Sequence, residues 1–310
     1  MDSRTLYQEA SRTIAHGSRS FAAASRLLDA PTRESTVLLY TWCRHCDDVV
    51  DGQELGFGQA MGPRHDPVQA LDQLQAQTLA ACHGHPAAHS AFQGLAEVVR
   101  RHGIPSALPM EHLAGFGMDV RGTAFCTLDD LLLYCWRVAG VVGVMMARVM
   151  GVTHPDTLDR ACDLGMAFQL TNIARDVLED AAIGRVYLPA DWLAEEGIEG
   201  AEGLLDPAHR EGIARVAARL VAEADPYYRS ARAGIADLPM RCAWSIATAR
   251  GVYREIGRKV VRVGAHAWDQ RIGTSAVEKL WFVARGAAVA LAAASVARPQ
   301  RPGNLFRRPM

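Results

Sequence analysis

The sequence predicts an all-α fold, and three features indicate it. Apolar residues recur every three or four positions over most of the 310 residues, which is the spacing of a buried helix face. No stretch alternates apolar and polar residues for long enough to form a strand. The breaks between helical segments contain glycine or proline, and none resembles a long linker. We therefore expect one all-helical domain over residues 1–310, with a disordered tail at about 298–310.

The expected helices follow one another between these breaks. Helical patterns run, in chain order, over 37–46, 128–142, 153–180, 209–235 and 239–265. Thr127 with Asp130 three positions later is typical of a helix cap, so the second pattern begins there. Pro155 is typical of the first turn of a helix, so the pattern over 153–180 is expected to begin near it.

Two groups of aspartates carry most of the functional information. The first contains Asp47, Asp48 and Asp51, and the second contains Asp176 and Asp180. Residues four apart on a helix share one face, so each group places two carboxylates one turn apart. Like charges at this spacing repel, whereas Mg²⁺ takes oxygen ligands from a few carboxylates and from substrate phosphates. Two such helices facing each other would bind a diphosphate through metal ions.

The second group ends a polar stripe on an otherwise apolar helix. The stripe contains Gln169, Asn172, Asp176 and Asp180, all on one face. Polar groups on a buried helix need partners, and a bound ion and anion would supply them. A third pair, Asp159 and Asp163, has the same spacing without this context, and we expect it on a solvated surface.

Charge and composition exclude several classes of protein. The net charge of −1 gives no indication of nucleic-acid binding. The segment Met1–Arg4 lacks the pattern of a signal peptide, and no run of eighteen uncharged apolar residues predicts a spanning helix. An odd number of cysteines, seven, favours reduced thiols in the cytoplasm. No dinucleotide-binding fingerprint follows a strand, so we expect no nicotinamide cofactor.

Together, these motifs resemble those of the squalene/phytoene synthases. The resemblance is carried, in the family's order, by Ser18-Arg19-Ser20-Phe21, Arg44 with Asp47-Asp48-x-x-Asp51, Tyr134 to Gly140, Gln169-x-x-Asn172-x-x-Arg175-Asp176-x-x-x-Asp180 and Arg185 to Pro189. The segments Trp268–Arg271 and Ser275–Leu280 are most similar to bacterial phytoene synthases. The resemblance implies an isoprenoid-synthase helical bundle around a central active-site cavity. It also implies a carotenoid-pathway prenyltransferase that condenses two geranylgeranyl diphosphates through a cyclopropyl diphosphate to phytoene, releasing two diphosphates.

The resemblance and the chemistry of the side chains assign roles to individual residues. The expected ligands of Mg²⁺ or Mn²⁺ are Asp47, Asp48, Asp51, Asn172, Asp176 and Asp180. The expected substrate-binding residues are Ser18, Arg19, Ser20, Phe21, Tyr40, Arg44, Gln169, Asn172, Arg175, Tyr253 and Arg271. Tyr134 occupies the position of a family active-site tyrosine and is expected to assist proton transfer beside the catalytic Asp47, Asp51, Asp176 and Asp180.

Two other functions stay open at the level of sequence. A squalene or dehydrosqualene synthase that uses farnesyl diphosphate would share these motifs, because chain length depends on apolar residues that the sequence alone does not place. A non-catalytic binding or assembly protein could share the fold, although such a protein should have lost the aspartates. Ordinary head-to-tail elongation fits less well, because its second motif would normally be another Asp-Asp-x-x-Asp.

A hydrocarbon product also bears on where the protein works. Phytoene cannot diffuse through water, so we expect peripheral contact with the inner face of the cell membrane by an otherwise cytoplasmic protein. The candidate surface is Leu280, Trp281, Phe282 and Val283, or the apolar rim of the cavity mouth, with Lys279 and Arg285 meeting lipid head groups. A core helix is the alternative for this stretch. A loose association with downstream carotenoid enzymes would serve the same transfer.

Overall fold

Helices make up the regular structure of the described residues, which are 6–7, 10, 24–52, 66–295 and 299–309 of the computed structural model. No strand occurs in these ranges, so the predicted all-α class is confirmed. In chain order, the helices are α3 (Ala30–Asp51), α4 (Pro67–Cys82), α5 (Ser90–His102), α6 (Ala107–Val120), α7 (Leu128–Cys135), η1 (Trp136–Gly140), α8 (Val141–Val149), α9 (Pro155–Ala182), α10 (Ala190–Glu195), α11 (Gly200–Leu205), α12 (Arg210–Gly234), α13 (Met240–Val263) and α14 (Ala276–Ala292).

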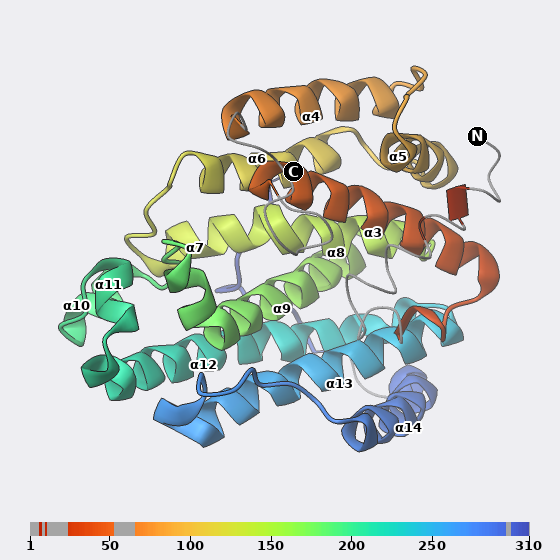
Figure 1. Ribbon diagram of the computed structural model, residues 1–310. Coiled ribbons are helices and arrows are strands. Elements are labelled where there is room, and N and C mark those ends of the chain that lie inside the picture. The colour runs from red at the N-terminus through yellow and green to blue at the C-terminus, as the bar shows by residue number, and fades with distance from the viewer. Residues whose placement is uncertain (1–5, 8–9, 11–23, 53–65, 296–298, 310) are drawn as a thin grey trace.

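The long helix α9 lies in the middle of the molecule (Figure 1). Helices α3 to α6 lie on one side of it in this view, and α12 to α14 lie on the other. Helix α9 packs against α12, α13, α8 and η1, and it contributes to the larger of the hydrophobic clusters. A second cluster joins α3 to α6 around the buried Trp42, whose indole N–H donates to the Thr78 hydroxyl at 3.3 Å.

The helix ends lie where local chemistry places them. The Thr127 hydroxyl accepts from the backbone N–H of Asp130, whose carboxylate accepts from the N–H of Thr127, so the predicted cap of α7 is confirmed. Pro155 occupies the first turn of α9, also as predicted. Helix α3 ends at Gly52, which adopts a φ of 63° that few other residues tolerate. This termination leaves the first aspartate group in the last turns of a helix.

The continuous helical segment Leu128–Val149 contains the π-helical turn η1. It is the one segment of the described residues that is long and apolar enough to cross a membrane, but 56% of its most apolar window is buried inside the protein. It packs against α6 and α9, and its apolar side chains belong to the core. A Cβ atom on Gly165 of α9 would lie 2.2 Å from the carbonyl oxygen of Ala139, so the close approach of α9 to η1 requires glycine there.

The expectation that Asp159 and Asp163 lie on a solvated surface is wrong for Asp163. Its side chain is fully buried, and Arg301 donates to both of its carboxylate oxygens at 2.9 and 2.7 Å. The Ser230 hydroxyl donates to the same carboxylate at 2.5 Å. A buried carboxylate needs such partners. They come from α12 and from the chain terminus, which are far away in sequence.

The expectation of a disordered tail over about 298–310 is also wrong for residues 299–309. Leu305 is buried, Arg308 forms an ion pair with Asp159 at 2.5 Å, and the backbone N–H of Phe306 donates to the Tyr227 hydroxyl at 3.1 Å. The acid pair on the first half of α9 therefore anchors the C-terminal segment.

We predict that Asp163→Ala lowers the free energy of unfolding by about 3–5 kcal/mol, because Asp163 is fully buried and its loss leaves the partly buried Arg301 without its counter-charge. Chemical denaturation of the two proteins measures the difference. Asp159→Ala is the matched control, since Asp159 itself is 32% exposed where Asp163 is fully buried, and an ion pair that water reaches contributes at most about 1 kcal/mol. Equal losses in the two variants would contradict the structural role of Asp163.

Candidate active site

The first aspartate group lies in the last two turns of α3. Arg44, one turn earlier, contacts the carboxylate of Asp47 at 2.9 Å and that of Asp48 at 2.7 Å. The C-terminal end of a helix carries partial negative charge, so carboxylates at this end are unfavourable without cations. Arg44 supplies one such cation, and its expected part in binding substrate stays a prediction.

The second group lies on the last turns of α9. Arg175 donates to Asp176 through Nε at 2.7 Å and through Nη2 at 2.5 Å. Arg271, from the segment between α13 and α14, contacts Asp176 at 3.2 Å and also forms an ion pair with Glu179. The structure therefore brings together the predicted arginines of this group with their carboxylates, although Arg271 is far from them in sequence.

Arg185 connects the two groups, a role that sequence reasoning missed. Its guanidinium contacts the carboxylate of Asp51 at 2.5 Å across 134 residues of chain. The same positive charge lowers the pKa of Asp47 and Asp180, against the larger effect of their burial. Arg185 therefore acts on acids of α3 and of α9 together. Its segment is part of the family resemblance, but nothing in the local sequence indicates which acid it meets.

The raised pKa values of two of these carboxyls reflect how closely the negative charges are grouped. Burial, together with the neighbouring charge of Asp176, raises the pKa of Asp180 to about 7. Burial also raises the pKa of Asp47 to about 6, where Asp51 and Asp48 add to the effect against the opposing charge of Arg44. Carboxyls in this condition have a strong electrostatic reason to bind divalent cations.

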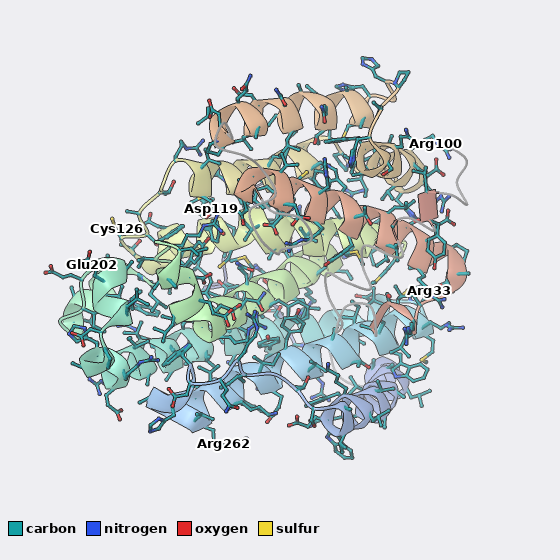
Figure 2. All side chains as sticks on the ribbon, in the orientation of Figure 1. Arg33, Arg100, Asp119, Cys126, Glu202 and Arg262 are labelled. Atoms are coloured by element: carbon teal, nitrogen blue, oxygen red, sulfur yellow. The ribbon has the colours of Figure 1, made fainter. Side chains whose placement is uncertain are left out.

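A partly buried acid that the sequence did not single out lies beside these groups. Asp119, at the end of α6 and labelled in Figure 2, accepts hydrogen bonds from the hydroxyls of Tyr134 and Tyr187, each at 3.0 Å. The two tyrosine rings stack with centroids 5.0 Å apart. Burial raises the pKa of Asp119 to about 6, and the charge of Asp51 adds to it.

A cavity of about 310 Å³ lies next to the polar stripe of α9. Gln169, Asn172 and Tyr253 line it, and the Tyr253 ring stacks on Phe168 with centroids 4.2 Å apart. Most of the remaining wall is apolar and comes from α8, η1, α9 and α13, including Val138, Val142, Met146, Leu164, Ile246 and Val252. The volume and lining are those of a site for an apolar ligand with a few polar contacts.

The residues present fit a divalent metal bound together with an anion. No three His, Cys, Asp or Glu side chains in the described ranges are grouped closely enough to hold a metal by themselves. Each aspartate group offers carboxylate oxygens, and Asn172 offers a buried side-chain oxygen that accepts no hydrogen bond from any described group. Mg²⁺ characteristically takes one or two carboxylates and completes its shell with water and substrate phosphates.

Of the remaining predicted residues, some lie in described parts of the chain and others do not. Tyr40 is half-buried on α3, and burial raises its pKa to about 12. The segment Ser18, Arg19, Ser20 and Phe21 lies outside the described residues. Tyr134 is buried with its hydroxyl bound to Asp119, so its expected part in proton transfer stays a prediction.

Comparisons with known proteins agree with this arrangement. A family described as squalene/phytoene synthase matches residues 14–278. The chain is 51% identical over 310 residues to a 15-cis-phytoene synthase of Pantoea ananas, covering 100% of both chains. It is 53% identical over 296 residues to a 15-cis-phytoene synthase of Enterobacter agglomerans, covering 95% of this chain and 99% of that one. A solved dehydrosqualene synthase in complex with a ligand superposes with a TM-score of 0.81 at 25% identity, covering 92% and 96% of the two chains.

We predict that Asp180→Asn stabilises the protein in EDTA at pH 8, on the order of 2 kcal/mol, since an ionised Asp180 is unfavourable in the folded state. The folded-state pKa of about 7 lies above the ordinary value of 3.8, so the gain should shrink as the pH falls through 7 and vanish near 4. Denaturation of both proteins across this pH range measures it. A gain that is independent of pH would contradict the electrostatic explanation.

Proposed function

Because the chain belongs to the squalene/phytoene synthase family, we propose that it joins two geranylgeranyl diphosphates head to head to give phytoene and two diphosphates. The observation that carries the proposal is the position of the apolar cavity. It begins at Gln169 and Asn172, on the same helix face as Asp176 and Asp180. A prenyl chain in the cavity would therefore place its diphosphate beside the carboxylates.

We propose that the carboxylates of Asp47, Asp51, Asp176 and Asp180, with Asp48 and the free oxygen of Asn172, hold Mg²⁺ or Mn²⁺ on the substrate diphosphate. The metal ions would neutralise charge on the departing diphosphate. Four arginines already lie against the acids and would share that anion: Arg44, Arg175, Arg185 and Arg271. Guanidinium groups suit this task, because their paired N–H donors match the geometry of phosphate oxygens.

The proposed reaction proceeds by two ionisations. The C1–O bond of one substrate breaks, which gives an allylic cation and free diphosphate. The double bond of the second substrate attacks this cation, and loss of a proton gives a cyclopropylcarbinyl diphosphate. Breakage of the second C–O bond, rearrangement and loss of another proton give the triene.

The protein would contribute a dry and shaped environment to these steps. The apolar wall of the cavity excludes water from the cation. The stacked rings of Phe168 and Tyr253 offer π faces toward the same space, and such faces attract cations. We also propose that Asp119 positions Tyr134 and Tyr187 through its two hydrogen bonds. Asp119→Asn would then alter the positions of the two tyrosine hydroxyls without removing a metal ligand.

The first prediction of this proposal concerns the product and the cofactor. The purified protein with Mg²⁺ should convert the C20 diphosphate to phytoene without NADPH, and EDTA should abolish conversion. Chromatography and mass spectrometry of the hydrocarbon identify the product. Preferential conversion of the C15 diphosphate would instead indicate a squalene or dehydrosqualene synthase. A strict need for NADPH, or equal turnover in EDTA, would contradict the proposal.

A second prediction concerns the aspartates. Asp47→Ala, Asp51→Ala, Asp176→Ala and Asp180→Ala should each lower turnover by at least about a hundredfold, the scale expected when a group that stabilises transition-state charge is lost. Circular dichroism should show intact folding, since each variant relieves repulsion among the acids and leaves other acids near the arginines of the site. Asp159→Ala is the control and should keep near-normal turnover. Near-normal turnover in Asp176→Ala would exclude the proposed metal site.

We also propose that one face of α14 contacts a lipid bilayer and so receives the hydrocarbon product. Val277, Leu280, Trp281 and Leu291 are between 62% and 76% exposed and share that face. Phe282 is buried against α13 residues and Val283 is half-buried, so the sequence-based surface was partly wrong. Lys279 borders the cavity, whereas Arg285 is exposed. A product released into the bilayer would need only a loose association with the next carotenoid enzyme.

Sedimentation with vesicles tests this contact. The protein should sediment partly with liposomes, more so with anionic lipid, and high salt should release it. Trp281→Ser should reduce the bound fraction, because it removes an exposed apolar anchor. Leu79→Ser on α4 removes an exposed apolar side chain from another helix and should have no effect. Protein that stays wholly in the supernatant with anionic vesicles at low salt would contradict the proposal.

A further inference from the structure

A second concentration of arginines lies on the face of α13 opposite the cavity. A pocket of about 80 Å³ between α12, α13 and α14 is lined by Arg232, Arg250, Arg254, Arg258 and Arg285. Arg250, Arg254 and Arg258 follow one another at intervals of four residues, so they share one helix face. Most residues of α13 that line the cavity, such as Ser245, Ala249 and Val252, belong to the other face. The pocket is therefore separate from the proposed active site.

Few acids balance these arginines. Arg254 donates to Asp225 at 2.8 Å, but Asp225 is shared with Arg229. Arg258 contacts Glu255 at 3.9 Å, and Glu255 is shared with Arg262. The half-buried Arg250 donates to the backbone carbonyl of Tyr228 at 2.7 Å rather than to a carboxylate. The pocket therefore has an excess of positive charge.

The electrostatics of Arg250 agree with this imbalance. Burial, together with the charges of Arg254 and Arg232, lowers its pKa to about 10. Like charges at this separation destabilise the folded protein unless an anion lies between them. Such an arrangement of guanidinium groups is suited to a group with several acceptor oxygens.

The packing of the helices keeps these side chains together. A Cβ atom on Gly286 of α14 would lie 2.3 Å from the Thr248 hydroxyl of α13, so glycine allows the two helices to approach closely. The approach brings Arg285 to the arginines of α13, with Phe282 beneath them in the same pocket. The pocket is much smaller than the 310 Å³ cavity, so it suits a phosphate group and not a prenyl chain.

We infer that this arginine pocket is a second anion site, which binds a phosphate group through guanidinium forks from three helices. Two sources share that chemistry. One is soluble inorganic phosphate or a small phosphate ester, and the other is the head group of an anionic phospholipid. The site is independent of the metal-dependent diphosphate chemistry proposed for the aspartates.

Binding of inorganic phosphate tests the inference. Titration calorimetry in EDTA, at ionic strength held constant with sodium chloride, should show binding to the unaltered protein. Arg250→Gln and Arg285→Gln should each weaken it about tenfold to a hundredfold, the effect of losing a charge-assisted hydrogen bond. Arg100→Gln on α5, labelled in Figure 2 far from α14, is the matched control and should bind as the unaltered protein does. Asp176→Asn should also leave phosphate binding unchanged, which separates this site from the proposed active site.

Vesicles distinguish the two sources. Loss of sedimentation with phosphatidylglycerol-containing vesicles in Arg285→Gln, but not in Arg100→Gln, identifies the lipid head group. Sedimentation that is equal in both, with phosphate binding lost in Arg285→Gln, identifies a soluble anion. Because Arg285 is exposed, its variant should fold normally, and thermal unfolding without anion should occur at an equal or higher temperature. If Arg285→Gln and Arg250→Gln bind both phosphate and vesicles as well as Arg100→Gln does, the inference is wrong.

Discussion

Mutual repulsion of carboxylates is the constraint on which the site depends. Acids from α3, α6 and α9 influence one another's ionisation, and burial makes their charges more unfavourable. Arginines from other parts of the chain neutralise them, and Arg185 does so by contacting Asp51 of α3 while acting on Asp180 of α9. A cluster of this kind does not favour stability, since buried ion pairs seldom stabilise a protein more than apolar packing does. The same cluster is suited to holding metal ions against an anion.

The same helix that carries the second acid group also shapes the cavity. Helix α9 approaches the π-helical turn η1 at Gly165, and residues of both elements line the apolar wall. A π-helical turn within a helix is often found at functional sites. The first half of α9 binds the C-terminal segment through Asp159 and Asp163, and the second half of α9 carries Asn172, Asp176 and Asp180. Helix α9 therefore links the tail, the cavity and the acids in one rigid element.

What could be predicted from the sequence depended on short-range relations. Helix periodicity, the Thr127 cap and the four-residue spacing of the acids are local, and the structure agrees with them. The family resemblance added the class of reaction. Contacts between distant residues were not accessible, such as Arg185 with Asp51, or Arg301 with Asp163 across 138 residues. The error over Asp163 has this origin, because an acid on an apparently ordinary helix face is buried only if a remote arginine reaches it.

Asp119 shows a second limit of the sequence. Its partners, Tyr134 and Tyr187, come from α7 and from the segment after α9, so no local pattern identifies it. The exposed face of α14 shows a third limit of the sequence. Leu280 and Phe282 are both strongly apolar, and the packing against α13 decides which one is buried. In each case the three-dimensional arrangement, and not the residue type, determines the role.

In the proposed reaction, the two aspartate groups and Asn172 hold metal ions on a substrate diphosphate whose prenyl chain occupies the apolar cavity. A crystal structure with Mg²⁺ and a thio-diphosphate analogue of geranylgeranyl diphosphate would show whether they do. We expect metal ions bound by Asp47, Asp51, Asp176 and Asp180, the Asn172 oxygen among the ligands, and the prenyl chain beside Phe168 and Gly165. A diphosphate bound away from these carboxylates, or a prenyl chain outside the cavity, would contradict it.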